Sequence, residues 1–267
     1  MWVAVVQMQS SGDLAANQAR AHELIAAAAG RGARFVALPE YFLCLGPPPT
    51  LVAHPLPPDG ATVQTFCQQA RDLSIYLLLG SIPEPAPVAG KVYNTSLLLS
   101  PDGKILARYR KIHLFDINIP GKVCFQESEH ILPGAEVIAV PLPKAGWTVG
   151  LAICYDLRFP ELFRALVDRG AEIIVLPAAF SQVTGRDHWE TLLRARAIEN
   201  QVYILAPAQY PHPDQSIKTY GRSLIIDPWG LSLARAADRE DIIFARLDHN
   251  YLSKIRTELP CLQNRRL

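Results

Sequence analysis

The chain alternates short apolar segments with stretches of helical periodicity, and this order limits the folds open to it. In the first half, apolar segments lie at 2–8, 35–38 and 75–79, separated by helical patterns that begin near Asp13 and cover 63–73. A helix between consecutive strands is typical of parallel strands, whose connections cross one face of the sheet. The alternation therefore predicts an α/β fold in which helices cover the sheets.

The second half adds hairpins to this pattern. Residues 96–109 and 224–235 each predict a β-hairpin, with turns at Pro-Asp-Gly and Pro-Trp-Gly. Further strands and helices are predicted between them: strands at 147–153 and 173–176, and helices that begin at Pro160 and near Asp187. Nothing in the sequence has the composition of a linker, so we expect one domain.

Three segments fall outside the predicted strands and helices. The Pro-rich stretches 46–58 and 83–87 predict surface loops, because a core element follows each of them at once. The tail at 249–267 is polar and basic, which predicts that it is either frayed or docked on a partner subunit.

Composition excludes several classes of function. The net charge is +1 over 267 residues, which gives no reason to expect binding to nucleic acid or to an anionic membrane. No apolar run approaches the ~18 residues of a membrane span, and the N-terminus lacks the basic region of a signal peptide. Five cysteines without a CxxC pair fit a reducing cytoplasm, and seven histidines without close pairing predict no metal site.

Three polar residues share one placement, directly after an apolar strand. Cys154 follows the strand 147–153 and precedes a turn and a helix, which is where an α/β protein displays a nucleophile. Position alone favours a buried structural thiol, because free cysteine is often buried. Glu40 and Lys111 also follow apolar strands, and each taken alone is best explained as a solvated charge.

The sequence around these residues resembles the three signature blocks of the nitrilase superfamily of carbon–nitrogen hydrolases. The blocks are Ala-Leu-Pro-Glu40, Arg-Lys111-Ile-His-Leu-Phe-Asp and Gly-Leu-Ala-Ile-Cys154-Tyr-Asp-Leu-Arg-Phe-Pro-Glu, in this order. The resemblance spans nearly the whole chain and includes Phe125-Gln-Glu127-Ser. It implies one carbon–nitrogen hydrolase domain over 1–267, a four-layer α-β-β-α sandwich, a homodimer or larger oligomer, and no cofactor.

The resemblance also implies a Glu–Lys–Cys triad. Glu40 is expected to be the general base, Lys111 the electrostatic stabiliser and Cys154 the nucleophile. A thiol needs a base to form the thiolate, and a carboxylate can serve where burial raises its pKa. Lys111 and the backbone N–H of Tyr155 would stabilise the oxyanion. Glu127 matches a second family glutamate and is expected to orient Lys111 or the substrate.

The tract that follows Cys154, together with 179–189, most resembles the amidase branch that contains ω-amidases and deaminated-glutathione amidases. This implies hydrolysis of a small linear amide, the terminal carboxamide of a carboxylic or 2-oxo acid, to the acid and ammonia through a Cys thioester. Arg158 could clamp a substrate carboxylate, and Thr184 could add a hydroxyl. An ion pair of Arg158 with Asp156 or Glu161 is an equal alternative.

The sequence leaves the substrate open, and three other functions are alternatives. Residues 116–127 look like ω-amidases, whereas 209–218 lack a His-His-Glu-Lys-type segment that we associate with deaminated-glutathione amidases. A nitrilase acting on R–C≡N would use the same triad. A nucleotide-binding α/β module needs a G-x-G-x-x-G turn, which is absent. An inactive scaffold is disfavoured by the intact triad.

Two further predictions concern the dimer interface and the loops around the site. The helix after Cys154, with Leu162, Phe163, Leu166 and Val167, and the C-terminal tail are candidate dimer-interface elements, although the same apolar residues could be core. The loops at 41–58 and 117–131 are candidates for closing over the site.

Overall fold

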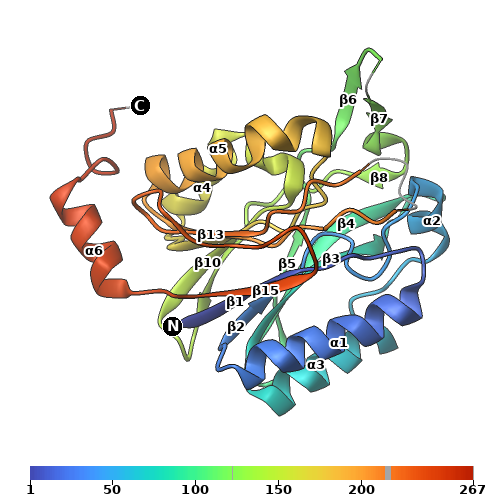
Figure 1. The fold of residues 1–267 in the computed structure, drawn as a ribbon, viewed down its shortest axis with the longest axis horizontal. Coiled ribbons are helices and arrows are strands. Elements are labelled where there is room, and N and C mark those ends of the chain that lie inside the picture. Colours follow the sequence, from blue (N-terminus) through green and yellow to red (C-terminus); the bar gives the residue numbers. More distant parts are fainter. Residues whose placement is uncertain (122, 214–217, 267) are drawn as a thin grey trace.

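Two β-sheets pack face to face, and helices cover both outer faces. The computed structural model describes residues 1–121, 123–213 and 218–266. Within them the layers follow the order helix, sheet, sheet, helix, as Figure 1 shows. The predicted four-layer sandwich in a single domain is confirmed.

The first sheet places two of the predicted site residues at one edge. Its strands, in spatial order, are β15 (Asp241–Arg246), β1 (Trp2–Gln7), β2 (Phe35–Ala37), β3 (Tyr76–Pro85), β4 (Val92–Leu99) and β5 (Ile105–Arg110), with β8 (Ile131–Leu132) beside β4. Strands β1, β2 and β3 are parallel, and two antiparallel pairings from β3 through β4 make β5 run in the same direction. The chain therefore leaves β2 and β5 at the same edge, where Glu40 and Lys111 follow.

Side-chain alternation explains how this sheet is covered on both faces. Residues such as Ala4 and Val6 point outward and pack against α1 (Leu14–Gly30) and α3 (Ala61–Leu73), whereas Val5 and its neighbours on the other face join the core between the sheets. Helix α1 begins where the sequence predicted, because the Asp13 side chain accepts a hydrogen bond from the Ala16 N–H at 3.0 Å.

The second sheet carries Cys154. Its strands, in spatial order, are β14 (Ser232–Arg235), β13 (Leu224–Ile226), β12 (Tyr203–Ala206), β11 (Ile173–Val175), β10 (Trp147–Leu151) and β9 (Ala139–Leu142). Strands β10, β11 and β12 are parallel. The outer face is covered by α4 (Pro160–Asp168) and α5 (Gln182–Asn200). The nucleophile candidate thus lies beyond the carboxyl end of a central parallel strand.

The predicted start of α5 is wrong by five residues. The helix begins at Gln182, because the Ser181 hydroxyl caps it by accepting from the Val183 N–H at 3.3 Å. Asp187 lies in the second turn, so its spacing to Glu190 is that of two neighbours on a helix surface, and it makes no capping box.

Two predicted loop or tail segments contain helices. The Pro-rich stretch 46–58 includes α2 (Pro48–Ala53), since proline is well tolerated in the first turn of a helix. The tail begins with α6 (His249–Glu258), whose Leu252 and Ile255 are buried. Arg256 donates to the backbone carbonyls of Gln201 and Ala171, so this part of the tail is held on its own protomer and is not frayed.

The apolar face of α4 belongs to the core. Leu162, Phe163 and Leu166 are buried within the protomer, and Val167 packs against the same cluster. For Leu162, Phe163 and Leu166 the alternative stated above, that they are core, is confirmed, whereas Val167 keeps partial exposure.

A small hairpin stands beside the sandwich near one end of the sheets (Figure 1). It consists of β6 (Asp116–Ile119) and β7 (Val123–Gln126), followed by a 3-10 turn at Glu127–Glu129. Lys122, in the predicted closing loop 117–131, and residues 214–217, in the segment 209–218, lie outside the described residues.

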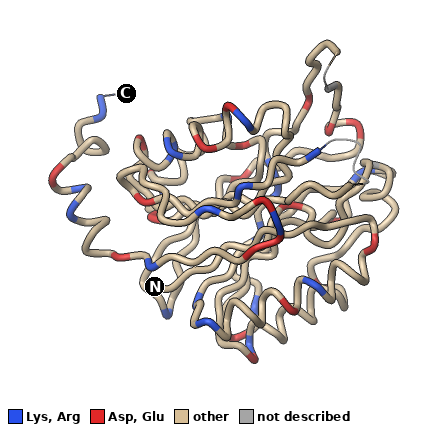
Figure 2. Tube along the Cα trace, viewed as in Figure 1, with Lys and Arg blue, Asp and Glu red and all other residues tan. Residues whose placement is uncertain are grey.

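The charged residues are distributed through the molecule. Figure 2 shows basic and acidic residues interspersed along the chain rather than gathered on one face. No helix of the described chain combines the length and the apolar character needed to cross a bilayer.

Candidate active site

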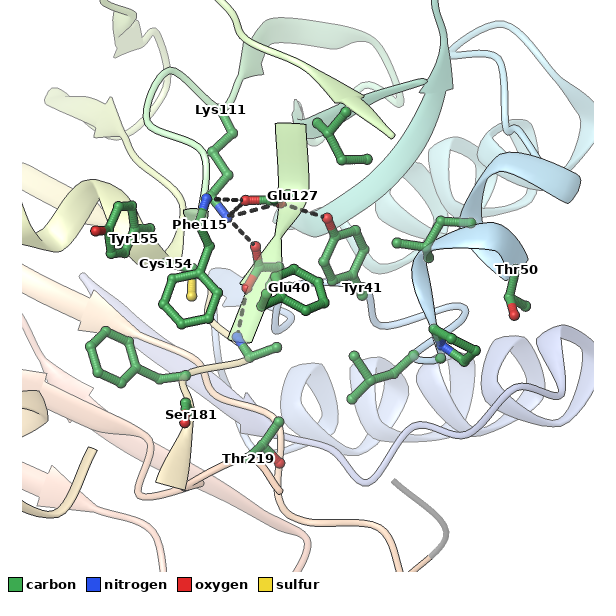
Figure 3. Close-up of a pocket in the computed structure, with 18 of the residues that line it drawn as sticks. Glu40, Tyr41, Thr50, Lys111, Phe115, Glu127, Cys154, Tyr155, Ser181 and Thr219 are labelled. Carbon is green, nitrogen blue, oxygen red and sulfur yellow. Dashed lines mark hydrogen bonds and ion pairs between the residues drawn. The ribbon is translucent and has the colours of Figure 1, made fainter. Parts of the chain in front are cut away.

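A cavity of about 840 Å³ lies at the strand ends of the two sheets. Its lining is mainly apolar and aromatic, but six of the predicted site residues contribute to it: Thr184 in α5, and Glu40, Lys111, Glu127, Cys154 and Tyr155. The last five come from the ends of strands in both sheets and from the 3-10 turn after β7, and Figure 3 shows them around one space. A large apolar cavity with a few converging polar groups is the usual form of a small-molecule site.

Glu40 is brought into the cavity by a close approach of its loop to strand β3. Pro39 and Glu40 follow β2, and a β-carbon at Gly80 would lie 1.8 Å from the Pro39 carbonyl oxygen. Glycine at this position lets the β3 strand bulge past the Glu40 segment. The next residue, Tyr41, has φ of 55° and donates its backbone N–H to Ser81 Oγ at 3.0 Å.

Lys111 is shared by two carboxylates. Its side chain is 2% exposed, and Nζ donates to Glu40 Oε1 at 3.2 Å and to Glu127 Oε2 at 2.8 Å. Burial alone would lower the pKa of Lys111, but the two carboxylates outweigh it and raise that pKa. The ammonium is therefore protonated throughout the neutral range, and Figure 3 shows it between the two glutamates.

Asn94 and Tyr41 complete this cluster, although neither was predicted. Asn94 Nδ2 donates to Glu40 Oε1 and to the Tyr41 hydroxyl, both at 2.8 Å, and that hydroxyl donates to Glu127 Oε1 at 3.0 Å. Asn94 is fully buried in β4. The only signal in the sequence is the polar run Asn94–Ser96 within an otherwise apolar strand.

Cys154 lies at the sharp exit from β10. Its φ is 47°, a left-handed conformation that costs energy for a residue with a β-carbon. Its backbone N–H is held by the Pro177 carbonyl at 2.9 Å. Burial raises the pKa of the Cys154 thiol, Glu40 raises it further, and Lys111 opposes the shift without cancelling it. The resting thiol is therefore protonated and needs a base before it can attack.

Backbone N–H groups beside the cavity connect Glu40 with the second sheet. Ala179 N donates to Glu40 Oε2 at 2.7 Å, so the carboxylate is held from the segment after β11. Tyr155 occupies the first turn of the 3-10 helix Cys154–Arg158, where N–H groups have no intrahelical acceptor. Its backbone can therefore donate to a group bound at Cys154.

The structure separates the two predicted substrate-binding residues. Thr184 lines the cavity, and within the described chain its buried Oγ1 has no hydrogen-bond partner. Arg158 does not line the cavity. Its guanidinium lies over the rings of Tyr155 and Phe180, and Nη1 is 3.3 Å from His188 Nδ1.

The alternative for Arg158, an ion pair with Asp156 or Glu161, is also not observed. Among the described contacts, Asp156 is bonded to Tyr109 and His113 instead. Arg158 therefore supports two aromatic residues of the cavity wall from behind. The direction of the Arg158 side chain is set by the 3-10 helix Cys154–Arg158. The spacing of residues in the sequence does not show that this turn is a 3-10 helix.

No metal-binding cluster accompanies these residues. In the ranges 1–121, 123–213 and 218–266, no three side chains of His, Cys, Asp and Glu are arranged to hold an ion. The positive charge nearest to Glu40 and Glu127 is the Lys111 ammonium, which occupies the position between them.

Comparison with known proteins identifies the family. The family model described as carbon-nitrogen hydrolase matches residues 2–257. The chain is 41% identical to a deaminated glutathione amidase of Synechocystis over 98% of this chain and 97% of the relative. It is 40% identical to the human omega-amidase NIT2, over 99% of this chain and 94% of the relative.

The fold agrees with the same family. The crystal structure of the C. elegans NitFhit protein superposes with a TM-score of 0.92 at 40% identity, covering 99% of this chain. This chain spans only 65% of the NitFhit chain. The chain belongs to the carbon–nitrogen hydrolase family. It is an enzyme that acts on carbon–nitrogen bonds other than peptide bonds, as its amidase relatives indicate.

Proposed function

We propose that this enzyme hydrolyses the terminal amide of a small carboxylic or 2-oxo acid through a thioester on Cys154. One observation carries the proposal: Cys154, Glu40 and Lys111 meet in one cavity, with Lys111 bonded to Glu40. A nucleophile, a base and a fixed cation are the groups that acyl transfer requires.

The acylation step follows from this arrangement. Glu40 accepts the thiol proton as Cys154 Sγ attacks the amide carbon, and the carbonyl oxygen becomes an oxyanion. The Lys111 ammonium and the Tyr155 N–H stabilise that charge. When the C–N bond breaks, the protonated Glu40 transfers its proton to the leaving nitrogen, so ammonia departs and a thioester remains.

The deacylation step uses the same residues in reverse. Glu40 accepts a proton from a water molecule, and the hydroxide formed attacks the thioester carbon. The second tetrahedral intermediate is stabilised by the same two donors. When the C–S bond breaks, the Cys154 thiolate recovers its proton from Glu40, which returns the enzyme to its resting state.

The cavity and the relatives together support this substrate class. The names of the relatives identify them as a deaminated glutathione amidase and an omega-amidase. The cavity is mainly apolar, with hydroxyl groups from Thr50, Ser181, Thr184 and Thr219 in its wall. Such a wall can hold a short acyl chain while a few hydroxyls bind its polar groups.

The proposal is tested by supplying three substrates to the purified enzyme. α-Ketoglutaramate, deaminated glutathione and an arylacetonitrile are each incubated with the protein, and released ammonia is measured. We expect turnover of one or both amides, together with a thioester adduct on Cys154 in rapidly quenched samples. Turnover of the nitrile alone would overturn the amidase proposal.

We further propose that the enzyme is a cytoplasmic homodimer or larger oligomer. All five cysteines are free, including the exposed Cys124 and Cys261, which fits a reducing compartment. Several large apolar side chains are exposed on α5 and on the hairpin at Gly230, which lies against Ile198: Ile198, Trp229, Leu231 and Leu233. Light scattering at micromolar concentration tests this, and a monomeric mass contradicts it.

A further inference from the structure

Asp156 is a fully buried carboxylate that the proposed reaction does not use. Its oxygens accept four hydrogen bonds. Oδ1 accepts from the backbone N–H of His113 at 3.1 Å and pairs with His113 Nδ1 at 2.7 Å. Oδ2 accepts from the Tyr109 hydroxyl at 2.6 Å and from the Ile153 N–H at 2.8 Å. Four donors compensate the charge of one carboxylate.

The positions of these donors in the chain define what Asp156 holds. Tyr109 and His113 lie two residues before and two residues after Lys111, and Ile153 directly precedes Cys154. One side chain therefore fastens both flanks of the Lys111 segment to the entry of the nucleophile turn. Those two segments belong to different sheets, so no strand pairing fixes their separation.

The Asp156–His113 pair is not placed to act as a base. Neither residue lines the cavity, and the His113 ring is stacked on Phe159 with centroids 3.6 Å apart. A carboxylate only accepts hydrogen bonds, so His113 Nδ1 carries the proton in this pair. The pair thus fixes the ring in place and has no contact with a substrate bound at Cys154.

We propose that Asp156 is a positioning residue that sets the distance between the Lys111 ammonium and the Cys154 nucleophile. This inference rests on the proposed function, because that distance matters only if both groups act on one carbonyl. The left-handed backbone at Cys154 needs an external restraint, and the bond from Ile153 N–H to Asp156 supplies one next to it.

Asp156→Asn is the sharpest test, because it keeps the shape and removes half of the acceptors. Whichever way the amide is turned, its NH₂ group faces two of the four donors. We expect kcat for the amide to fall about 100-fold, the cost of misplacing catalytic groups by about 1 Å, while KM changes far less. The pH profile of Cys154 alkylation by iodoacetamide, followed on the Cys154 peptide by mass spectrometry, should shift to higher pH as Lys111 moves away.

Glu84→Gln is the matched control. Glu84 is also a buried carboxylate that binds residues of β4 and β5, namely Thr95, Arg108 and Arg110, but it does not line the cavity. The Glu84→Gln variant should have a lower free energy of unfolding, while its kcat and the pH profile of its Cys154 alkylation stay at wild-type values. If Asp156 were merely structural, Asp156→Asn would behave in the same way, and that result overturns the proposal.

Tyr109→Phe decides the matter if Asp156→Asn does not fold. It removes one donor and keeps the ring, so we expect a several-fold loss of kcat with a smaller shift of the alkylation profile in the same direction. An unchanged profile and kcat in Tyr109→Phe count against the proposal. Failure of the proposed function is recognised separately, because the wild-type enzyme would then release no ammonia from either amide.

Discussion

Two buried carboxylate clusters lie on the first sheet, and they differ in what surrounds their cations. At Glu84, Arg110 donates at 2.5 Å and is 32% exposed, and Arg108 is 50% exposed. At Glu40 and Glu127, the shared cation Lys111 is 2% exposed and faces an internal cavity. The first cluster ties strands together at the surface. The second keeps charge where water is scarce, and there it can act on a bound molecule.

The two clusters also shift pKa values in opposite ways. Burial would raise the pKa of Glu84, but hydrogen bonds from Arg110 and Thr95 outweigh it, so the pKa is lowered. In the cavity, burial and Glu40 raise the pKa of the Cys154 thiol despite Lys111. The cluster at Glu84 therefore favours the ionised carboxylate, whereas the cluster in the cavity favours the protonated Cys154 thiol.

Removing the thiol should give the largest effect. Cys154→Ala is expected to lower kcat by about 10⁴-fold or more, because no other side chain of the cluster can form the thioester. Ammonia release from the amide measures this, and an unfolding transition confirms that the variant is folded. Cys67→Ala is the control, since Cys67 is a buried thiol in α3 away from the cavity. Full activity in Cys154→Ala would show that the mechanism is wrong.

Exchanging one cation in each cluster should separate their roles. Lys111→Met is expected to lower kcat by about 10²- to 10³-fold through loss of oxyanion stabilisation. It should also cost about 3–5 kcal/mol of unfolding free energy, because two buried carboxylates lose their partner. Arg110→Met should leave kcat unchanged. Steady-state kinetics and urea unfolding of both variants test the comparison, and equal kinetic losses would contradict it.

The stability of the two clusters should depend on pH in opposite directions. Glu84 has a lowered pKa, so its contribution is present above its ordinary value of 4.5 and is lost as the pH falls through the folded value. Cys154 has a raised pKa, so its contribution is complete below its ordinary value of 9.0 and is lost as the pH rises through the folded value.

Two variants test this by unfolding measurements across the pH range. Glu84→Gln should weaken the loss of unfolding free energy on the acid side and leave the alkaline side unchanged. Cys154→Ala should do the reverse. If Glu84→Gln altered the alkaline side instead, the assignment of the two pH ranges to the two clusters would fail.

Resemblance to the nitrilase signature blocks, and not strand position alone, singled out Glu40, Lys111 and Cys154 as candidate site residues. Glu40, Lys111 and Cys154 each follow a strand that its apolar residues make recognisable, and parallel strands bring such ends to one edge. Asn94 could not be predicted in this way, because its contacts with Glu40 and Tyr41 depend on how β4 is placed relative to the loop after β2. Nor could the direction of Arg158, which depends on the backbone of the 3-10 helix after Cys154.

The fold was predicted with the same limits. Alternating patterns predicted sheets covered by helices and most of the strands, since burial of apolar side chains decides them, and the family resemblance supplied the four-layer order. Boundaries that depend on one side chain were missed, as at Ser181, whose hydroxyl caps α5 ahead of the predicted start at Asp187. Strand β3 continues past its predicted end at residue 79, after an irregularity in its pairing between Leu79 and Ile82. At this irregularity Gly80 lies against the loop that carries Glu40, a contact that the sequence pattern does not show.

The smallest expected effect concerns two hydroxyls that lack partners within the described residues. Thr184 Oγ1 lines the cavity, whereas Ser96 Oγ is buried in β4 next to Thr95, which binds Glu84. If substrate supplies the missing partner of Thr184, Thr184→Val should raise KM about 2- to 10-fold, the worth of one neutral hydrogen bond. Neither Thr184→Val nor Ser96→Ala breaks a bond within the protein, so both should fold normally. Ser96→Ala is the control and should leave KM unchanged. An unchanged KM in Thr184→Val as well would show that Thr184 does not bind substrate. The buried Lys111 and its two carboxylates would then be the only tested difference between the cavity and the cluster at Glu84.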